Sequence, residues 1–255
     1  TWLGWPADIE DELVAWVADN REATRSGERS RMAEVAGRFD AIITRLLDAR
    51  RGGGIDDVTA RLMRDGIDGD PLPDKEIVSI LRNWTAGDLG SLAASVGVIV
   101  HHLATDVAVQ GYLRGLVAAD RTREFEDALE EILRIDDPFV SNRRITTTDT
   151  VVGGERIGAG TRVVLNWTAA NRDPLAFAEP DAFNPHEHAA DNLVFGIGPH
   201  VCPGRALTLM ELRVIVWELL SQTAHIGMSR ERGAVRELPP VSGWAKVPVV
   251  LDPVA

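Results

Sequence analysis

The sequence contains a single cysteine, Cys202, among its 255 residues. One cysteine cannot form an intramolecular disulfide, so the chain is not a small secreted scaffold held together by disulfides, and we expect a reducing, cytoplasmic location. The sequence also lacks any apolar run close to the roughly 20 residues that a membrane-spanning helix needs. We therefore expect no membrane segment in this chain.

Basic residues are in the minority, because 27 Lys and Arg face 39 Asp and Glu, which gives a formal net charge of -12. A negatively charged surface repels a phosphate backbone, so we expect no nucleic-acid partner. The hydrophobic fraction of 45% is sufficient for a folded core in a chain of this length. No repeat, low-complexity segment or linker divides the sequence, which predicts a single domain over residues 1–255.

Helical periodicity dominates the sequence. The segments predicted to be helical are 11–21, 31–51, 56–63, 74–104, 121–135 and 204–220. Segment 74–104 has no proline and is apolar on most faces, so we expect one long helix through the core. In segment 139–168, β-branched runs around Gly153-Gly154 predict short strands and hairpins, and Pro239, Pro240 and 247–251 predict a small terminal hairpin. The predicted fold class is mainly α with a minor β part.

Residues 195–206 read FGIGPHVCPGRA, a glycine-rich loop that enters a helix with Cys202 at the junction. Unpaired N–H groups and the positive end of the helix dipole favour a thiolate there. Pro203 suits a first helical turn, and Gly196, Gly198 and Gly204 would let the backbone approach a flat macrocycle closely. The alternative is an ordinary buried thiol.

The pattern F-G-x-G-x-H-x-C-x-G closely resembles the haem-binding signature of the cytochrome P450 family, and Ala206-Leu207 and Glu211 follow in the expected places. The resemblance implies a cytochrome P450-like haem-thiolate fold that lacks its N-terminal region. It also implies that Cys202 is the thiolate ligand to the iron of haem b. The cofactor-binding residues that it implies in this loop are Phe195, Gly196, His200, Cys202 and Gly204.

Two further segments resemble the same family in the same order. Glu131-Ile132-Leu133-Arg134 is similar to its E-x-x-R helix motif, whose i, i+3 side chains share one helix face and can form a buried ion pair. Downstream, NRDP at 171–174 and PDAF at 180–183 resemble the stretch before the cysteine loop. The arginine that the family often places before this phenylalanine is Ala182 here, so the third partner of the ion pair is left open.

The resemblance also implies that Arg144 and His200 contact the haem propionates, where a cation and an N–H donor offset buried carboxylate charge. The alternative is a solvated arginine and an ordinary loop histidine. In the predicted helix 74–104, AGDLG at 86–90 aligns with the family pattern A-G-x-[D/E]-T, which places Ala86 and Gly87 against the haem. Glycines inside a helix indicate close approach of a ligand or of another helix.

Leu89 and Gly90 occupy the positions at which the family has an acid and an alcohol that help to deliver protons during oxygen activation. Neither residue can transfer a proton. The neighbouring polar residues Asp88 and Ser91 are the catalytic candidates. The alternative is that they face elsewhere, because one step along a helix turns a side chain by about 100°.

Other patterns give no second site. His101-His102 and His186-x-His188 lack a third ligand at a suggestive spacing, so we interpret these histidines as structural or exposed. The glycines at 154, 158 and 160 lie between predicted strands rather than before a helix, so they do not indicate a dinucleotide site. Reduction would therefore require an external ferredoxin or flavin reductase.

The resemblance implies a monooxygenase that inserts oxygen from dioxygen into a small organic substrate, with the thiolate of Cys202 promoting O–O cleavage. Two alternatives stay open: a peroxide-driven peroxygenase or peroxidase, and a haem-binding protein without turnover. The chain is markedly shorter than family members, and it begins with Thr1 rather than Met. We expect a missing N-terminal segment, through clipping or an incomplete chain, or a second polypeptide that pairs with a natural fragment.

Overall fold

The computed structural model describes residues 3–67, 69–238 and 242–254, except for the side chain of Asp88, and it divides into two compact units, Thr1–Ser91 and Leu92–Ala255. Each unit has a hydrophobic core of its own. Compact units defined by contacts do not show how the chain unfolds. The single domain expected over residues 1–255 therefore stays a prediction.

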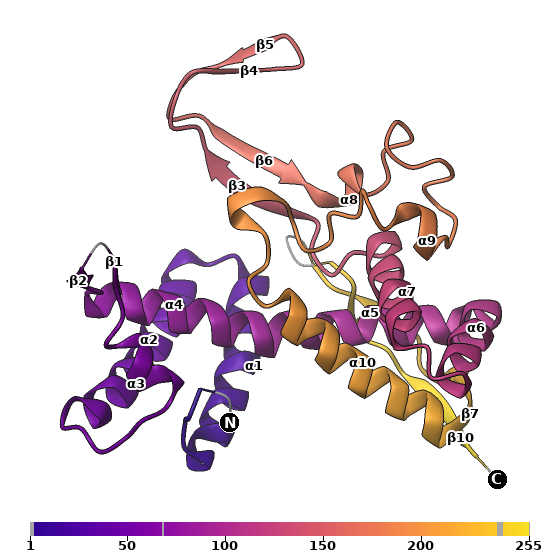
Figure 1. Ribbon diagram of the computed structural model, residues 1–255, viewed down its shortest axis with the longest axis horizontal. Coiled ribbons are helices and arrows are strands. Elements are labelled where there is room, and N and C mark those ends of the chain that lie inside the picture. Colours follow the sequence, from indigo (N-terminus) through magenta and orange to yellow (C-terminus); the bar gives the residue numbers. More distant parts are fainter. Residues whose placement is uncertain (1–2, 68, 239–241, 255) are drawn as a thin grey trace. The chain divides into compact units, whose positions relative to one another are not determined.

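The first unit is built mainly from helices. Its elements are η1 (Ala7–Ile9), α1 (Glu10–Ser26), α2 (Arg29–Arg51), α3 (Val58–Leu62), the short pair β1 (Gly66–Ile67) and β2 (Asp70–Pro71), and α4 (Asp74–Ala86) (Figure 1). Gly27, with φ 68°, ends α1 in the left-handed conformation that glycine adopts without strain. Trp16 of α1 stacks on Phe39 of α2 with ring centroids 4.0 Å apart in the core. The helices predicted over 11–21, 31–51 and 56–63 are confirmed in type.

The predicted regular helix over 74–104 is wrong in one respect. A π-helical turn, Gly87–Leu92, separates α4 from α5 (Ala93–Thr105). Wide turns of this kind are rare and often occur at functional sites. A Cβ built on Gly87 or Gly90 meets no atom within 4 Å, so close approach of another described helix does not explain these glycines.

In the second unit, α5 packs against α6 (Val107–Ala118), α7 (Thr122–Ile135) and strand β7 (Thr223–Met228), and α10 (Arg205–Gln222) packs against α6 and α7 (Figure 1). Its fully buried core side chains include Val98, Ile99, Leu103, Leu113, Phe125, Leu129, Ile132, Leu212, Val216 and Ile226. Helix α6 was not predicted. Its start carries an ordinary N-cap, because the Asp106 carboxylate accepts the amides of Ala108 and Val109, each at 3.0 Å.

The strands form short antiparallel pairs, in agreement with the predicted minor β part. The pairs are β3 (Ser141–Ile145) with β6 (Arg162–Asn166), β4 (Thr150–Val152) with β5 (Glu155–Ile157), β7 (Thr223–Met228) with β10 (Val249–Pro253), and β8 (Val235–Arg236) with β9 (Trp244–Lys246). Figure 1 shows the β4–β5 hairpin extending beyond the β3–β6 pair. The predicted terminal hairpin is wrong for residues 247–251, since β10 pairs with β7, and Pro239 and Pro240 lie outside the described residues.

Three short elements lie between β6 and α10 in the chain: α8 (Trp167–Ala170), α9 (Pro185–His188) and the 3-10 turn η3 (Gly198–His200). Among the described residues, no single helix is long and apolar enough to cross a membrane. Segments Asp74–Thr105 and Val107–Ala118 reach the length and hydropathy of a membrane span only when taken together, and the chain bends by 109° between them.

Candidate functional site

Cys202 lies in a loop whose backbone requires glycine. Gly196 and Gly198 have φ values of 75° and 71°, in the left-handed region that a side chain disfavours. The amide of Cys202 donates to the carbonyl of Phe195 at 2.8 Å, and the amide of Gly196 donates to that of Leu193 at 2.8 Å. The loop therefore folds back on itself and holds the cysteine just before α10.

The surroundings of Cys202 leave its thiol accessible. Cys202 is half-buried, while Ile197 and Val201 in the same loop expose 68% and 45% of their surface. A Cβ added to Gly204 would lie 3.9 Å from the Cys202 sulfur, so glycine keeps the space beside the thiol open. A sulfur donor with apolar surface around it offers both a metal ligand and a partner for a flat apolar ring.

The donor set fits a haem better than a bare metal ion. In the described part of the chain, no three His, Cys, Asp or Glu side chains cluster in a way that could hold a metal ion. One thiolate is sufficient when a macrocycle supplies the remaining equatorial ligands of the iron. The residues around Cys202 therefore fit a haem.

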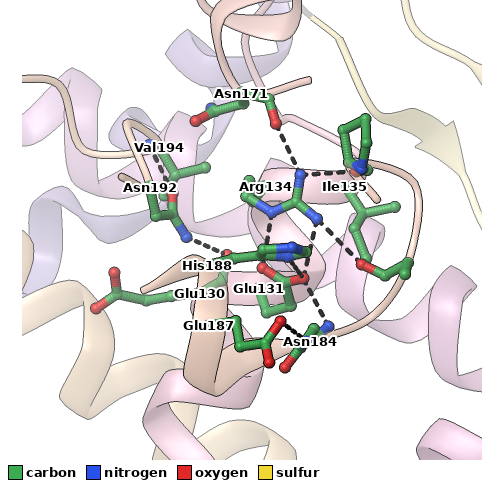
Figure 2. Close-up of polar contacts among 12 residues, drawn as sticks. Glu130, Glu131, Arg134, Ile135, Asn171, Asn184, Glu187, His188, Asn192 and Val194 are labelled. Carbon is green, nitrogen blue, oxygen red and sulfur yellow. Dashed lines mark hydrogen bonds and ion pairs between the residues drawn. The ribbon is translucent and has the colours of Figure 1, made fainter. Parts of the chain in front are cut away.

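Helix α7 carries the predicted ion pair, and the structure confirms that it is buried. The two Glu131 carboxylate oxygens accept Arg134 Nε at 2.7 Å and Nη2 at 2.9 Å, with side chains that are 2% and 0% exposed (Figure 2). Arg134 also donates to the carbonyls of Asn171 and Pro180 at 2.7 and 2.8 Å. The pair thus fixes the segment that precedes the cysteine loop.

His188 is the third partner that the sequence left open. Its Nδ1 lies 2.7 Å from Glu131 Oε1, which also accepts the amide of Asn184 at 2.9 Å (Figure 2). The structural interpretation of His188 was correct, but its contact with Glu131 was not predicted. Ala182 contributes only its carbonyl, which accepts Arg134 Nη2 at 3.2 Å.

The network keeps Glu131 ionised. Burial by itself would raise the pKa of Glu131, but hydrogen bonds from Arg134, from the amide of Asn184 and from His188 hold it below its usual value.

Glu130, the residue before Glu131, anchors the cysteine loop at two points. Its carbonyl accepts Asn192 Nδ2 at 3.1 Å (Figure 2), and its carboxylate accepts Arg205 Nη2 at 2.8 Å.

The implied propionate contacts lie on two separate elements of the second unit. Arg144 is half-buried in β3, paired with Val163 of β6, and its Nη1 donates to the carbonyl of Arg143 at 2.9 Å. His200 is exposed in η3, two residues before Cys202. Their contact with a propionate stays a prediction.

The remaining predicted residues belong to the first unit. Ala86 ends α4, and Gly87, Asp88 and Ser91 lie in the π-helical turn, while the side chain of Asp88 lies outside the described part of the structure. A π-helical turn holds more residues than an α-helical one, so the rotation of about 100° per residue does not apply here. Participation of these four residues in one site with Cys202 stays a prediction.

The other histidine pair has structural contacts. His101 stacks on Trp244 with ring centroids 3.7 Å apart, and His102 lies 6.3 Å from the ring of Phe183. Burial, as the largest cause, lowers the pKa of both imidazoles. Both therefore favour the neutral form in which a histidine packs against aromatic rings.

Comparisons with known proteins give a consistent result. The family model described as Cytochrome P450 matches residues 125–225. Linalool 8-monooxygenase of Pseudomonas putida is 30% identical over 86% of this chain and 53% of its own length. Cyclomarin C epoxidase CymV of Salinispora arenicola is 29% identical over 94% of this chain and 61% of its own.

The structural comparison agrees over nearly the whole chain. The open cytochrome P450 Eryk from S. erythraea aligns with a TM-score of 0.87 and 26% identity, covering 98% of this chain and 64% of that protein. The chain thus spans between about half and two thirds of the length of the relatives it matches. The mainly helical fold, the loop around Cys202 and these likenesses agree, and the chain belongs to the cytochrome P450 family, whose members carry a haem.

Proposed function

We propose that this chain forms the haem-binding part of a monooxygenase that inserts oxygen from dioxygen into a small organic substrate. In this proposal Cys202 is the thiolate ligand to the iron of haem b. The observation that carries it is the conformation of the Cys202 loop. Two glycines at positive φ and the hydrogen bond from the Cys202 amide to the Phe195 carbonyl hold the loop, and the single thiol lies among exposed apolar side chains.

Several residues of this chain would bind and orient the haem. Phe195, Gly196 and Gly204 belong to the loop that would lie against the ring. Ala86, which ends α4, and Gly87 of the π-helical turn are the further haem-binding residues that the resemblance implies. Arg144 and His200 would bind its propionates, because a guanidinium and an imidazole N–H compensate carboxylate charge. When bound, the haem supplies the activation of dioxygen, and a thiolate ligand favours cleavage of its O–O bond.

Asp88 and Ser91 are our candidates for moving protons to the reacting oxygen. Both lie in the π-helical turn, whose other members, Gly87, Leu89, Gly90 and Leu92, have no side-chain group that can transfer a proton. Proton transfer by a positioned side chain typically contributes about 10²–10⁴-fold to a rate. Asp88 would hold the proton, and the Ser91 hydroxyl would pass it on.

The substrate and the electron donor are assigned only by class. The relatives are named for linalool, cyclomarin C and vitamin D(3), three different organic molecules, which supports a small organic substrate of unassigned skeleton. Electrons would come from an external ferredoxin or flavin reductase. The single cysteine and the acidic composition support a cytoplasmic location.

A peroxide-driven peroxygenase is the second candidate, and Leu89 and Gly90 favour it. Hydrogen peroxide arrives with its own protons, so it depends less on a positioned acid and alcohol. A haem-binding protein without turnover is the third candidate. A tight, specific substrate-induced spectral change in the haem-loaded protein would argue against this third candidate.

The ligand is tested by spectroscopy of the reduced, carbon monoxide-bound protein. We expect the far-red-shifted Soret band of a thiolate-ligated haem, lost in Cys202→Ala. Thr208→Ala, which removes a hydroxyl near Gly204 and leaves the only thiol in place, is the control. An unchanged Soret band in Cys202→Ala would contradict the assignment.

A further inference from the structure

Asn171 is a fully buried residue that joins three segments of the second unit. It follows α8, and its carbonyl accepts Arg134 Nη1 of α7 at 2.7 Å (Figure 2). Its side-chain Oδ1 accepts the amide of Leu193 at 2.8 Å. Its Nδ2 points to the Asp137 carboxylate, 3.4 Å away. One side chain therefore lies between the end of α7 and the start of the cysteine loop.

The contact at Leu193 is connected to Cys202 through the backbone. The Leu193 carbonyl accepts the amide of Gly196, and the Phe195 carbonyl accepts the amide of Cys202, both at 2.8 Å. Leu193 is thus a point at which the loop is attached to buried structure, in addition to the two contacts of Glu130, and the hydrogen bonds that follow lead to the backbone of Cys202. Movement at Leu193 would be transmitted to Cys202, because the intervening residues are tied to each other.

The attachment depends on the orientation of the Asn171 amide. Only its oxygen can accept the N–H of Leu193, and its NH₂ group must then find an acceptor on the other side. Asp137 supplies that acceptor. An ionised carboxylate has no donor, so it cannot bind the amide in the flipped orientation.

Asp137 occupies a position that is unfavourable for a charged group. It is 4% exposed, and burial, as the largest cause, raises its pKa to about 6. The charged groups that face it are Asp136, which raises the pKa of Asp137 further, and Arg172, which lowers it. The nearby Thr168 hydroxyl and the hydrogen bond from Asn171 also lower this pKa. A buried carboxylate that costs stability is explained if its acceptor oxygen has a structural task.

We propose that Asp137 and Asn171 form a positioning pair for the haem ligand, in which the Asp137 carboxylate orients the Asn171 amide and this amide anchors the Cys202 loop at Leu193. Neither residue touches the thiol. Both act through the backbone from Leu193 to Cys202. The inference rests on the proposed function only in so far as Cys202 binds haem, because the anchoring itself is a property of the chain.

Hydrogen–deuterium exchange of the haem-loaded protein tests the pair at pH 7.5. In Asn171→Ala the amide of the half-buried Leu193 loses its acceptor, so we expect segment 193–202 to exchange about tenfold faster or more, while the middle of α10 keeps its protection. The thiolate-type carbon monoxide spectrum should also be lost at a lower denaturant concentration. Asn166→Ala is the matched control, since it removes another asparagine oxygen that accepts a backbone amide, that of Ala169 at 3.0 Å.

Asp137→Asn decides the matter if Asn171→Ala does not fold. Its amide keeps the shape of the carboxyl group but is a weaker acceptor, so we expect exchange of segment 193–202 to rise about two- to fivefold. Global unfolding should need more denaturant, because a buried charge is gone. Faster local exchange together with higher global stability is not expected of a merely structural residue.

Unchanged exchange of segment 193–202 in either variant would overturn the pair, as would an equal acceleration in every segment or in Asn166→Ala. These outcomes are separate from failure of the proposed function. Absence of a thiolate-type spectrum in the parent protein would refute haem ligation by Cys202 but would leave the exchange result intact.

Discussion

At the scale of single residues, buried polar side chains carry the largest energetic consequences in this protein. Glu131, Arg134, Asp137 and His188 are each at most 4% exposed. Three of them satisfy one another through bonds of 2.7–2.9 Å, whereas Asp137 has a raised pKa. The two cases predict opposite effects on removal of the charge.

Glu131→Ala should strongly destabilise the protein, because it leaves the Arg134 guanidinium charged and buried. The expected loss is about 3–5 kcal/mol of unfolding free energy, and a lower haem-loaded yield should follow without a change in substrate preference. Denaturant titration measures the loss. Glu126→Ala on the same helix is the control, since its pair with Arg213 has side chains 27% and 31% exposed and should cost about 1 kcal/mol or less. Equal losses in both variants would contradict the prediction.

Asp137→Asn should stabilise the protein more at pH 7.5 than at pH 5. Because the folded-state pKa of about 6 lies above the usual value of 3.8, the folded state binds the proton more tightly, and stability is lost as pH rises through this window. The shift corresponds to about 3 kcal/mol, from which the weaker hydrogen bonds of an amide subtract. We expect a gain of about 1–3 kcal/mol at pH 7.5 and a smaller one at pH 5.

Unfolding free energies of parent and variant at the two pH values provide the measurement. Asp181→Asn is the control, because its side chain is 81% exposed, and it should show no such pH dependence. A gain that is the same at both pH values would mean that Asp137 is not the titrating group.

At the scale of elements, the π-helical turn Gly87–Leu92 is the feature with the clearest functional consequence. It contains Asp88 and Ser91, our candidates for proton transfer, and also Leu89 and Gly90, which cannot perform it. Because Leu89 and Gly90 occupy the usual positions of the acid and the alcohol, proton transfer would depend on the neighbouring Asp88 and Ser91. We expect this transfer to be inefficient and electron consumption to be poorly coupled to product formation. The parent protein should form product faster with hydrogen peroxide than with a reductase system.

Restoring the acid and the alcohol should improve coupling. In Leu89→Asp with Gly90→Thr, product formed per electron consumed should rise, since positioned proton transfer is worth about 10²–10⁴-fold in rate. Gly90→Thr has room, because a Cβ there meets no atom within 4 Å. Asp88→Ala in the otherwise unchanged protein is the companion variant. Tight coupling in the parent that is lost in Asp88→Ala would refute poor coupling and make Asp88 the relay.

At the scale of the whole molecule, the question is whether the two compact units unfold together. Their cores are separate clusters, with Leu47 at 1% exposure in the first and Leu129 at 0% in the second. The boundary after Ser91 falls within helical backbone rather than in a loop. Because a helical boundary favours cooperative unfolding, we propose one transition, in agreement with the single domain that the sequence predicts.

Leu47→Ala and Leu129→Ala should then act on the same transition, and each should lower its free energy of unfolding by about 2–5 kcal/mol. Denaturant unfolding followed by tryptophan fluorescence and by circular dichroism checks this, because coincident curves indicate a single transition. Leu175→Ala, at a leucine that is 95% exposed, should leave it unchanged. Two transitions, each shifted by only one of the variants, would show that the units unfold independently.

The sequence by itself determined the features that depend on local spacing. The i, i+3 relation of Glu131 and Arg134 places both on one helix face, and Gly196 and Gly198 before Cys202 have the positive φ that only glycine adopts easily. Apolar periodicity gave most of the helices. Even so, Asp106 capped an unpredicted helix, because a single N-cap inside an apolar stretch is a weak local signal.

Tertiary structure alone decided which distant residues meet. His188 lies 57 positions after Glu131, Leu193 lies 22 after Asn171, and β10 pairs with β7 rather than with a neighbour in sequence. No period or spacing encodes such contacts, because each forms only when burial removes water and leaves a polar group one available partner. The π-helical turn is similar, since its wide hydrogen bonding depends on local packing that hydrophobic periodicity does not report.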